Sequence, residues 1–551
     1  MTLQPHREIL EFWRAVARFS FRDGAFVFGG RAHSDSVSDA QQLLGILWPA
    51  TQQPRYRLDV PDRTDEEVLG PLEMIGDRHS APLRLLRAQT AYLLRYRDAD
   101  GMPTFTCGEE SAAGHECVES FAVGLQFSLA AKGFSRVYRS AVTKAGIVAE
   151  ADELESLATL RLTTAMIGLL RSFVAHAFDD DSPSGTALYR LIGQEHRERT
   201  AVLNEYRSEM AEYRARALED VTIASVAPAG SADLPYIECG WTWGVSADAV
   251  VVDTREDHGP QLDGAAAPMP DPYFTWVAGD AIRQLTSPRT RLLGLLTEEQ
   301  SRLGQSLQLR LELARFSWAR QATFGDHRWP LERLPWSGDS DYTSLLVAAI
   351  TASELASRTG NTDLPYAYLL RVFGRLAARR AIVRPPKVEA APPVVEDRRV
   401  PLRFGDPDRA GDHRTPGFTT VLFDALVSAA AGTNNGQLRT ELTDLAALAW
   451  DHRPEGMNWQ NTHRLVSGLV TAYEVMDGET GRSGPPLGFV HQLLADADDA
   501  FESLPADDGA DEARRKELAA RLDRARRIID QHPARAAALL YPVLAELDER
   551  L

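Results

Sequence analysis

An internal repeat in the C-terminal half of the chain is the feature that most limits its possible folds. The tripeptide Asp-His-Arg, a polar loop with tryptophan and a segment reading Leu-x4-(Ile/Val)-Thr-Ala-x-Glu occur between Asp326 and Glu354 and again between Asp451 and Glu474. The copies lie roughly 120 residues apart, which is longer than one helical hairpin, so each copy should be a multi-helix unit. The repeat therefore predicts an α/α stack or partial toroid.

Aligning the two copies on Glu354 and Glu474 makes two structural predictions. Ala348 falls opposite Gly468, and small residues at equivalent positions indicate helices that pack closely on their neighbours. Asp341 falls opposite Asn461, just before the predicted repeat helix, where an N-cap residue is expected.

Helical periodicity dominates the rest of the sequence. Apolar residues recur at spacings of three and four in six N-terminal segments, and a charged pattern predicts one long, exposed helix over residues 188–220. Aromatic and β-branched residues at 21–31 and 236–252 indicate a small hairpin and other short strands. The predicted class is all-α or nearly so, in two lobes, with a few short β-hairpin decorations. The six segments are residues 7–20, 38–47, 66–75, 82–96, 118–141 and 151–178.

The length of 551 residues and the distribution of proline predict the domain organisation. Such a chain is too long for one ordinary domain. A Pro-containing break at 260–272 suggests an N-terminal helical domain with small β elements at 1–265 and a C-terminal helical repeat domain at 266–551. Closely spaced prolines at 383–416 cannot continue a helix, so this segment is predicted to be a long loop.

Charge and hydropathy exclude several classes of function. The formal net charge of -18 repels phosphate backbones, so nucleic acid is not an expected partner. No window approaches the ~18 uncharged apolar residues needed to span a bilayer, and the N-terminal residues form an amphipathic helix rather than a signal peptide. An odd number of cysteines, three, argues against a disulfide framework. We expect a cytoplasmic protein without membrane insertion.

The segment 318–341 is the most site-like part of the sequence. Its aromatic residues beside acids and a histidine could hold and protonate a sugar or an extended apolar ligand. In that case Asp339 or Asp341 would be the acid and His327 the proton shuttle. The alternative is structural, with the tryptophans packed on the core and Asp341 as an N-cap. The candidate ligand-binding residues are Trp329, Trp336 and Trp459.

The cysteines provide a second candidate site. Cys107, His115 and Cys117 lie close together in the sequence, and Cys239 could complete a Cys3His zinc site. The spacing matches no standard zinc motif. We therefore expect neither a metal nor another cofactor.

No phosphate-binding loop, dinucleotide fingerprint, nucleophile elbow or zinc-protease motif occurs in the sequence. Helical stacks without catalytic signatures often present surfaces to other proteins. The favoured hypothesis is a non-catalytic interaction or scaffold protein with protein partners in a cytoplasmic bacterial complex. The alternative is an α/α-toroid enzyme acting on a glycan, polyol or isoprenoid through the loop 318–341.

Overall fold

The computed structural model describes most of the chain up to residue 476 and shorter stretches beyond it. It contains two compact units, Met1–Ala472 and Tyr473–Leu551. The described residues are 3–29, 34–106, 116–192, 197–219, 224–226, 235–255, 258–261, 263–327, 340–358, 362–383, 415–453 and 459–476, and short stretches between 493 and 547.

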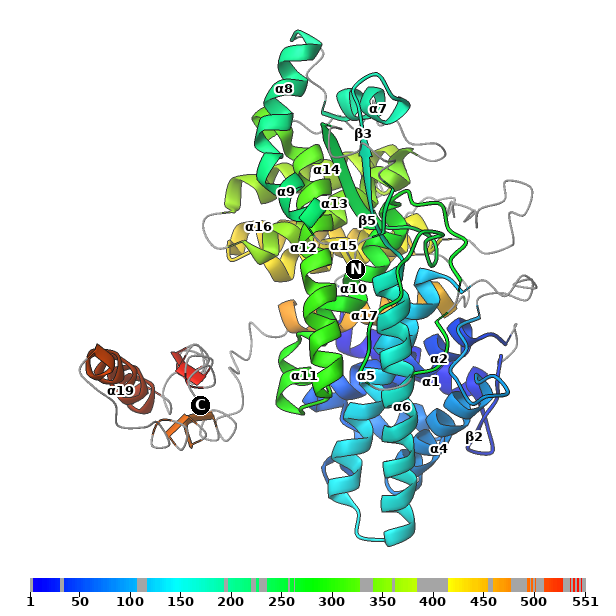
Figure 1. Cartoon of the computed structure of the whole chain (residues 1–551). Helices are drawn as coiled ribbons and strands as arrows, with labels where there is room; N and C mark the ends of the chain where they lie inside the picture. Colours follow the sequence, from blue (N-terminus) through cyan, green and yellow to red (C-terminus); the bar gives the residue numbers. More distant parts are fainter. Residues whose placement is uncertain are drawn as a thin grey trace. The chain divides into compact units, whose positions relative to one another are not determined.

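The first part of the larger unit is helical, as predicted. Its longest helices, α5 and α6, form an antiparallel hairpin (Figure 1). Nearly every side chain of α5 from Val118 to Ser135 is buried, which makes this helix the centre of the core. The helices are α1 (Pro5–Ser20), α2 (Ser36–Gln52), α3 (Glu66–Leu69), α4 (Ser80–Arg95), α5 (Val118–Ala141) and α6 (Ala145–Arg171).

The predicted hairpin near residue 21 is confirmed. Strands β1 (Phe21–Arg22) and β2 (Ala25–Phe26) pair antiparallel. The turn between them places Asp23 and Gly24 at φ 51° and 76°, the left-handed conformation that short hairpins require.

A small sheet replaces the end of a predicted helix. The helix expected over 151–178 ends at Arg171, and the next residues form β3 (Phe173–Phe178). Strand β3 pairs parallel with β4 (Ala224–Val226) and antiparallel with β5 (Tyr236–Trp241). The prediction was wrong here because strand pairing with distant residues decides the structure of this aromatic segment.

The single long helix expected over 188–220 was also wrong. The chain forms α7 (Pro183–Ile192), α8 (Arg199–Glu209) and α9 (Ala211–Glu219), with a break at Met210. Each of the last two helices packs separately on α12 (Glu298–His327): Tyr206 meets Phe324 at 5.3 Å and Tyr213 stacks on Phe316 at 5.4 Å. Figure 1 shows α8 and α9 beside this long helix.

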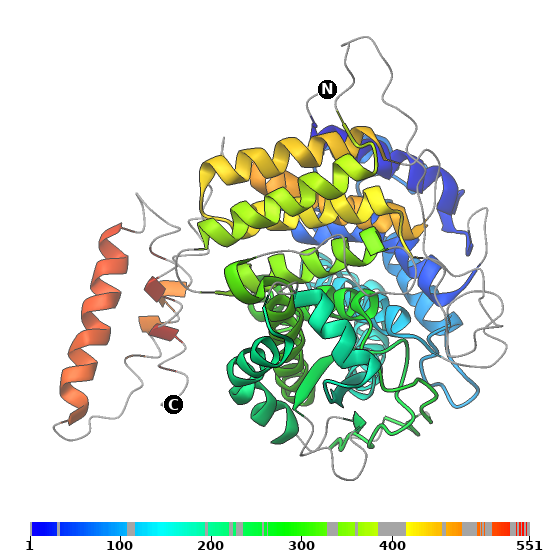
Figure 2. The same cartoon turned by 90° about the horizontal axis from the view of Figure 1, so that it is seen from above.

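Consecutive helices pack in pairs in the remainder of this unit, as a helical stack requires. Helix α12 packs on α13, α13 on α14 and α15, and α15 on α16. In Figure 2 the yellow-green to yellow helices of this region lie side by side. They are α10 (Pro272–Leu285), α11 (Pro288–Leu292), α12 (Glu298–His327), α13 (Ser340–Ser357), α14 (Asp363–Arg379), α15 (Phe418–Gly432), α16 (Gly436–Asp451) and α17 (Trp459–Met476).

The repeat helices are α13 and α17. A Cβ atom on Gly468 of α17 would lie 2.7 Å from the ring of Phe423, so α17 approaches α15 as closely as the small residue allows. Ala348 of α13 is fully buried, and this helix also packs on α15. Gly468 therefore lies where α17 meets α15, and the equivalent Ala348 lies in the core.

The domain boundary expected near residue 265 falls inside the larger unit. Helix α10 packs on α5 and α12 packs on α6, so helices from both sides of that boundary share one core. The chain divides instead between Ala472 and Tyr473. The predicted Pro-rich loop at 383–416 lies outside the described residues except for 383 and 415–416.

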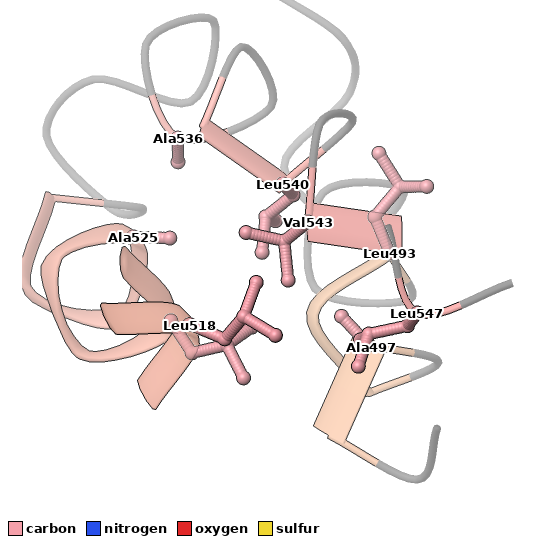
Figure 3. Close-up of a cluster of buried hydrophobic side chains, with 9 residues drawn as sticks. Leu493, Ala497, Leu518, Ala525, Ala536, Leu540, Val543 and Leu547 are labelled. Atoms are coloured by element: carbon pink, nitrogen blue, oxygen red, sulfur yellow. The ribbon is translucent and has the colours of Figure 1, made fainter. Parts of the chain in front are cut away.

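The smaller unit has its own hydrophobic core (Figure 3). Helix α19 (Ala510–Ile528) contributes Leu518, Leu522 and Ala525, which follow each other at spacings of four and three. The other core residues repeat the same spacing; they are Leu493, Ala497, Ala536, Leu540, Val543 and Leu547.

None of the helices among the described residues is both long and apolar enough to cross a membrane.

Candidate functional site

The tryptophan loop of the first repeat copy lies outside the described residues, and so do Trp329, Trp336 and Asp339. His327 ends α12, and its side chain also lies outside them. Trp459, the tryptophan of the second copy, begins α17 and is only 8% exposed. Its ring meets Phe19 of α1 edge-on at 6.3 Å. Trp459 therefore packs between helices of the core.

The aligned residues Asp341 and Asn461 both lie inside their helices rather than at the N-cap. Asp341 is the second residue of α13 and pairs with Arg379 at 3.1 Å and Arg380 at 3.3 Å. Asn461 is the third residue of α17, and its Oδ1 accepts a hydrogen bond of 2.8 Å from the backbone N–H of Gly417. Each side chain connects its helix to another part of the fold.

The structure describes two of the three cysteines. Cys117 is the N-cap residue of α5, and Cys239 lies on β5; both are buried. Burial raises the pKa of the Cys239 thiol to about 12, so it stays protonated at neutral pH. Cys107 and His115 lie outside the described residues. Among the residues that the structure does describe, no three or more His, Cys, Asp or Glu side chains come together as a metal site would need.

A groove along α12 is a candidate site of the larger unit. It has a volume of about 440 Å³ and is bordered by α9 and by the C-terminal ends of α8 and α13. Its floor is apolar, formed by Leu309, Leu313 and Phe316 of α12 and by Tyr213 of α9. Leu309 is 36% exposed, so the floor is accessible to solvent at this position.

The rim of this groove is mostly acidic. Among its described lining residues, four are glutamates, at positions 209, 212, 312 and 354, and two are arginines, at 216 and 315. The guanidinium of Arg315 lies 3.9 Å from the Glu354 carboxylate, and both side chains are largely buried. Glu209 is in an ion pair with Arg320, so the negative charge at the surface of the groove comes from the exposed carboxylates of Glu212 and Glu312, partly offset by the exposed Arg216.

A buried polar cluster occupies the interior of the same unit. Asp280 of α10 is its centre and accepts hydrogen bonds from Arg464 at 2.6 Å, Arg283 at 2.8 Å and Gln126 at 3.0 Å. The Arg464 guanidinium also stacks on the ring of Trp276 at 4.3 Å. A neighbouring set links Gln460 to Glu119 at 2.7 Å and to Tyr273 at 3.1 Å. Side chains from α5, α10 and α17 thus hold one another in place.

Burial and neighbouring charges shift the pKa values of three side chains in this cluster in different directions. Burial alone would raise the pKa of Asp280, but Arg464 and Arg283 outweigh it and keep that pKa lowered. Burial and the charge of Asp280 raise the pKa of Asp424, on α15, to about 7. Burial lowers the pKa of His463 to about 3, so its imidazole is neutral at neutral pH. The cluster therefore contains one ionised aspartate, Asp280, and one aspartic acid, Asp424, that keeps its proton up to about pH 7.

Neither the groove nor the buried cluster was predicted from the sequence. A signal for the cluster exists: Tyr273, Trp276, Asp280 and Arg283 follow each other at spacings of three, four and three, which places them on one face of α10. The groove has a similar signal, because Leu309, Glu312, Leu313 and Phe316 share one face of α12. Neither pattern shows by itself whether the face is covered.

Comparison with known proteins identifies the family. No curated protein and no solved structure matches the chain. The model of the family described as SCO2524-like matches residues 1–455 and 453–551. The chain therefore belongs to the SCO2524-like family.

Proposed function

We propose that this protein is a non-catalytic interaction protein that binds a protein partner in the groove along α12. The observation that carries the proposal is the apolar floor of that groove, in which Leu309 stays 36% exposed beside Leu313 and Phe316. Partner proteins commonly anchor in such concave apolar surfaces, which are surrounded by a polar rim.

Charge and hydropathy support a cytoplasmic setting for this function. The net charge of -18 disfavours nucleic acid as the partner. The same charge keeps a large cytoplasmic protein soluble while it exposes an apolar floor. We accordingly propose a cytoplasmic complex in which a second protein covers the groove.

The enzyme alternative depends on different residues. It needs the loop 318–341 to form a cavity in which an acid meets a glycan, polyol or isoprenoid. The positions of Trp459, in the core, and of Asp341, in ion pairs with α14, do not favour it. The interaction function depends only on residues that line the groove along α12, whereas the enzyme function needs Trp459 and Asp341 in a cavity.

Affinity purification of the full chain from its native host tests the proposal. The groove variant is Leu309→Asp, which places a charge on the apolar floor at an exposed position. Leu364→Asp is the matched control, because Leu364 is 59% exposed on α14 and does not line the groove. We expect a stoichiometric partner with the wild type and with the control, and recovery reduced about tenfold or more with Leu309→Asp.

Two results would contradict the proposal. One is equal recovery of the partner with Leu309→Asp and Leu364→Asp, which would place the interaction elsewhere. The other is the absence of any stoichiometric partner from the wild type, which would favour screening for a substrate.

A further inference from the structure

We propose that the groove along α12 accepts an amphipathic helix of the partner protein, with arginine or lysine on both sides of a leucine-rich ridge. This inference rests on the proposed function and specifies the chemistry of the partner. It follows from the helical walls of the groove, the length of its floor and the charge of its rim.

The walls of the groove favour a helix over an extended strand. Its described lining residues belong to α8, α9, α12 and α13. Adding a strand requires a sheet edge with unpaired backbone N–H and C=O groups, whereas helix walls satisfy their own backbone groups. Ridges of side chains on a bound helix can instead enter the grooves between side chains of these helices.

The floor has the length that two turns of a bound helix need. Leu309, Leu313 and Phe316 are spaced by four and three residues, so the apolar stripe extends for about 10 Å along α12. Tyr213 stacks on Phe316 at 5.4 Å and fixes the orientation of that ring. An apolar ridge with anchors at i, i+4 and i+7 matches this stripe.

The rim selects for positive charge. Glu212 lies on α9 and Glu312 on α12, and both are exposed where a bound helix would pass. The Glu312 carboxylate accepts a hydrogen bond of 3.3 Å from the neutral amide of Gln308. Arg216 is also exposed on α9 and offsets one of these two charges, while Glu209 and Glu354 form ion pairs with Arg320 and Arg315. Arginine or lysine beside the ridge would complement this rim, whereas acidic residues would be repelled.

Binding of three synthetic helices to the full chain tests the inference. The first carries Leu at i, i+4 and i+7 with Arg on both sides; the second replaces each Arg with Glu; the third replaces each Leu with Ser. Fluorescence anisotropy at low salt should show binding of the first peptide. The affinities of the second and third peptides should be lower by about tenfold or more.

Charge reversal in the protein provides the sharper measurement. The double variant Glu212→Arg/Glu312→Arg should invert the preference, so that the Glu-containing helix binds better than the Arg-containing one. The matched control is Glu73→Arg/Glu153→Arg, which changes the net charge equally at two exposed glutamates that do not line the groove. The control should keep the preference of the wild type, and circular dichroism checks that both variants are folded.

The outcomes separate this inference from the function on which it rests. Equal binding of the Arg and Glu helices by the wild type, or the same preference in both double variants, would overturn the basic helix as the occupant. If Leu309→Asp nevertheless abolishes recovery of a native partner, the interaction function stands with a partner of another chemistry. If that variant has no effect either, both proposals fail.

Discussion

Asp424 shows how one residue can couple the stability of this protein to pH. Burial and the nearby charge of Asp280 raise its pKa from 3.8 to about 7. The folded chain therefore keeps a proton on this carboxyl at pH values where the unfolded chain has released it. The stabilisation is complete below pH 3.8, decreases as pH rises toward 7 and is lost above that value.

The variant Asp424→Asn should remove this dependence, because an amide has the shape of the protonated acid and does not titrate. Between pH 5 and pH 8 the free energy of unfolding of the variant, relative to the wild type, should rise by about 2 kcal/mol. Urea unfolding of both proteins at both pH values measures this change. A difference that is the same at pH 5 and pH 8 would show that Asp424 does not titrate between them.

The burial of the polar cluster could not be predicted from single residues. A sequence window around Asp280 contains charged residues at helical spacing, and such a face is usually exposed to solvent. Asp280 is buried because Arg464, from a helix 184 residues away, supplies the compensating charge.

The alignment of Asp341 with Asn461 correctly brought together two polar residues near the starts of helices. It could not show that each contacts a neighbouring segment instead of capping its own helix.

At the scale of helices and strands, local patterns predicted the type of most elements, and distant contacts decided where they end. The predicted helix over 118–141 matches α5, where nearly continuous burial reinforces the helical pattern. The predicted helix over 151–178 ended too late, because Phe173–Phe178 pairs with Tyr236–Trp241. Only the partner strand distinguishes this aromatic segment from a buried helix.

The close approach of α17 and α15 leads to a prediction about two glycines. Gly468→Ala would place a Cβ atom 2.7 Å from the Phe423 ring and should lower the free energy of unfolding by about 1–3 kcal/mol. Gly374→Ala on α14 is the matched control, because its Cβ would meet nothing within 4 Å. The control should be neutral or stabilising by up to about 1 kcal/mol, as alanine favours a helix. Chemical unfolding of the three proteins compares them, and equal effects of the two substitutions would contradict close packing at Gly468.

At the scale of the whole molecule, the chain forms two compact units, but not those that proline content predicts. The break at 260–272 is rich in proline, yet α10 follows it and packs on α5. Proline ends helices without separating cores, so a composition break can be a loop within one unit. Past the division at residue 473 the sequence is also rich in glycine and proline, between Gly478 and Gly488. Composition does not distinguish this break from the one at 260–272; the separate hydrophobic core beyond it identifies the smaller unit.

Separate cores predict that a cavity in one unit destabilises that unit selectively. Leu540 is fully buried in the smaller unit, so Leu540→Ala should cost about 3 kcal/mol there. Hydrogen exchange on the full chain should then show faster exchange of the α19 amides, with those of α5 and α6 unchanged. Leu426→Ala, at a fully buried leucine of α15, is the matched control and should accelerate exchange in the larger unit instead. If Leu540→Ala accelerated exchange in α5 as much as in α19, the two cores would unfold as one cooperative unit, and the division at residue 473 would not be a division in stability.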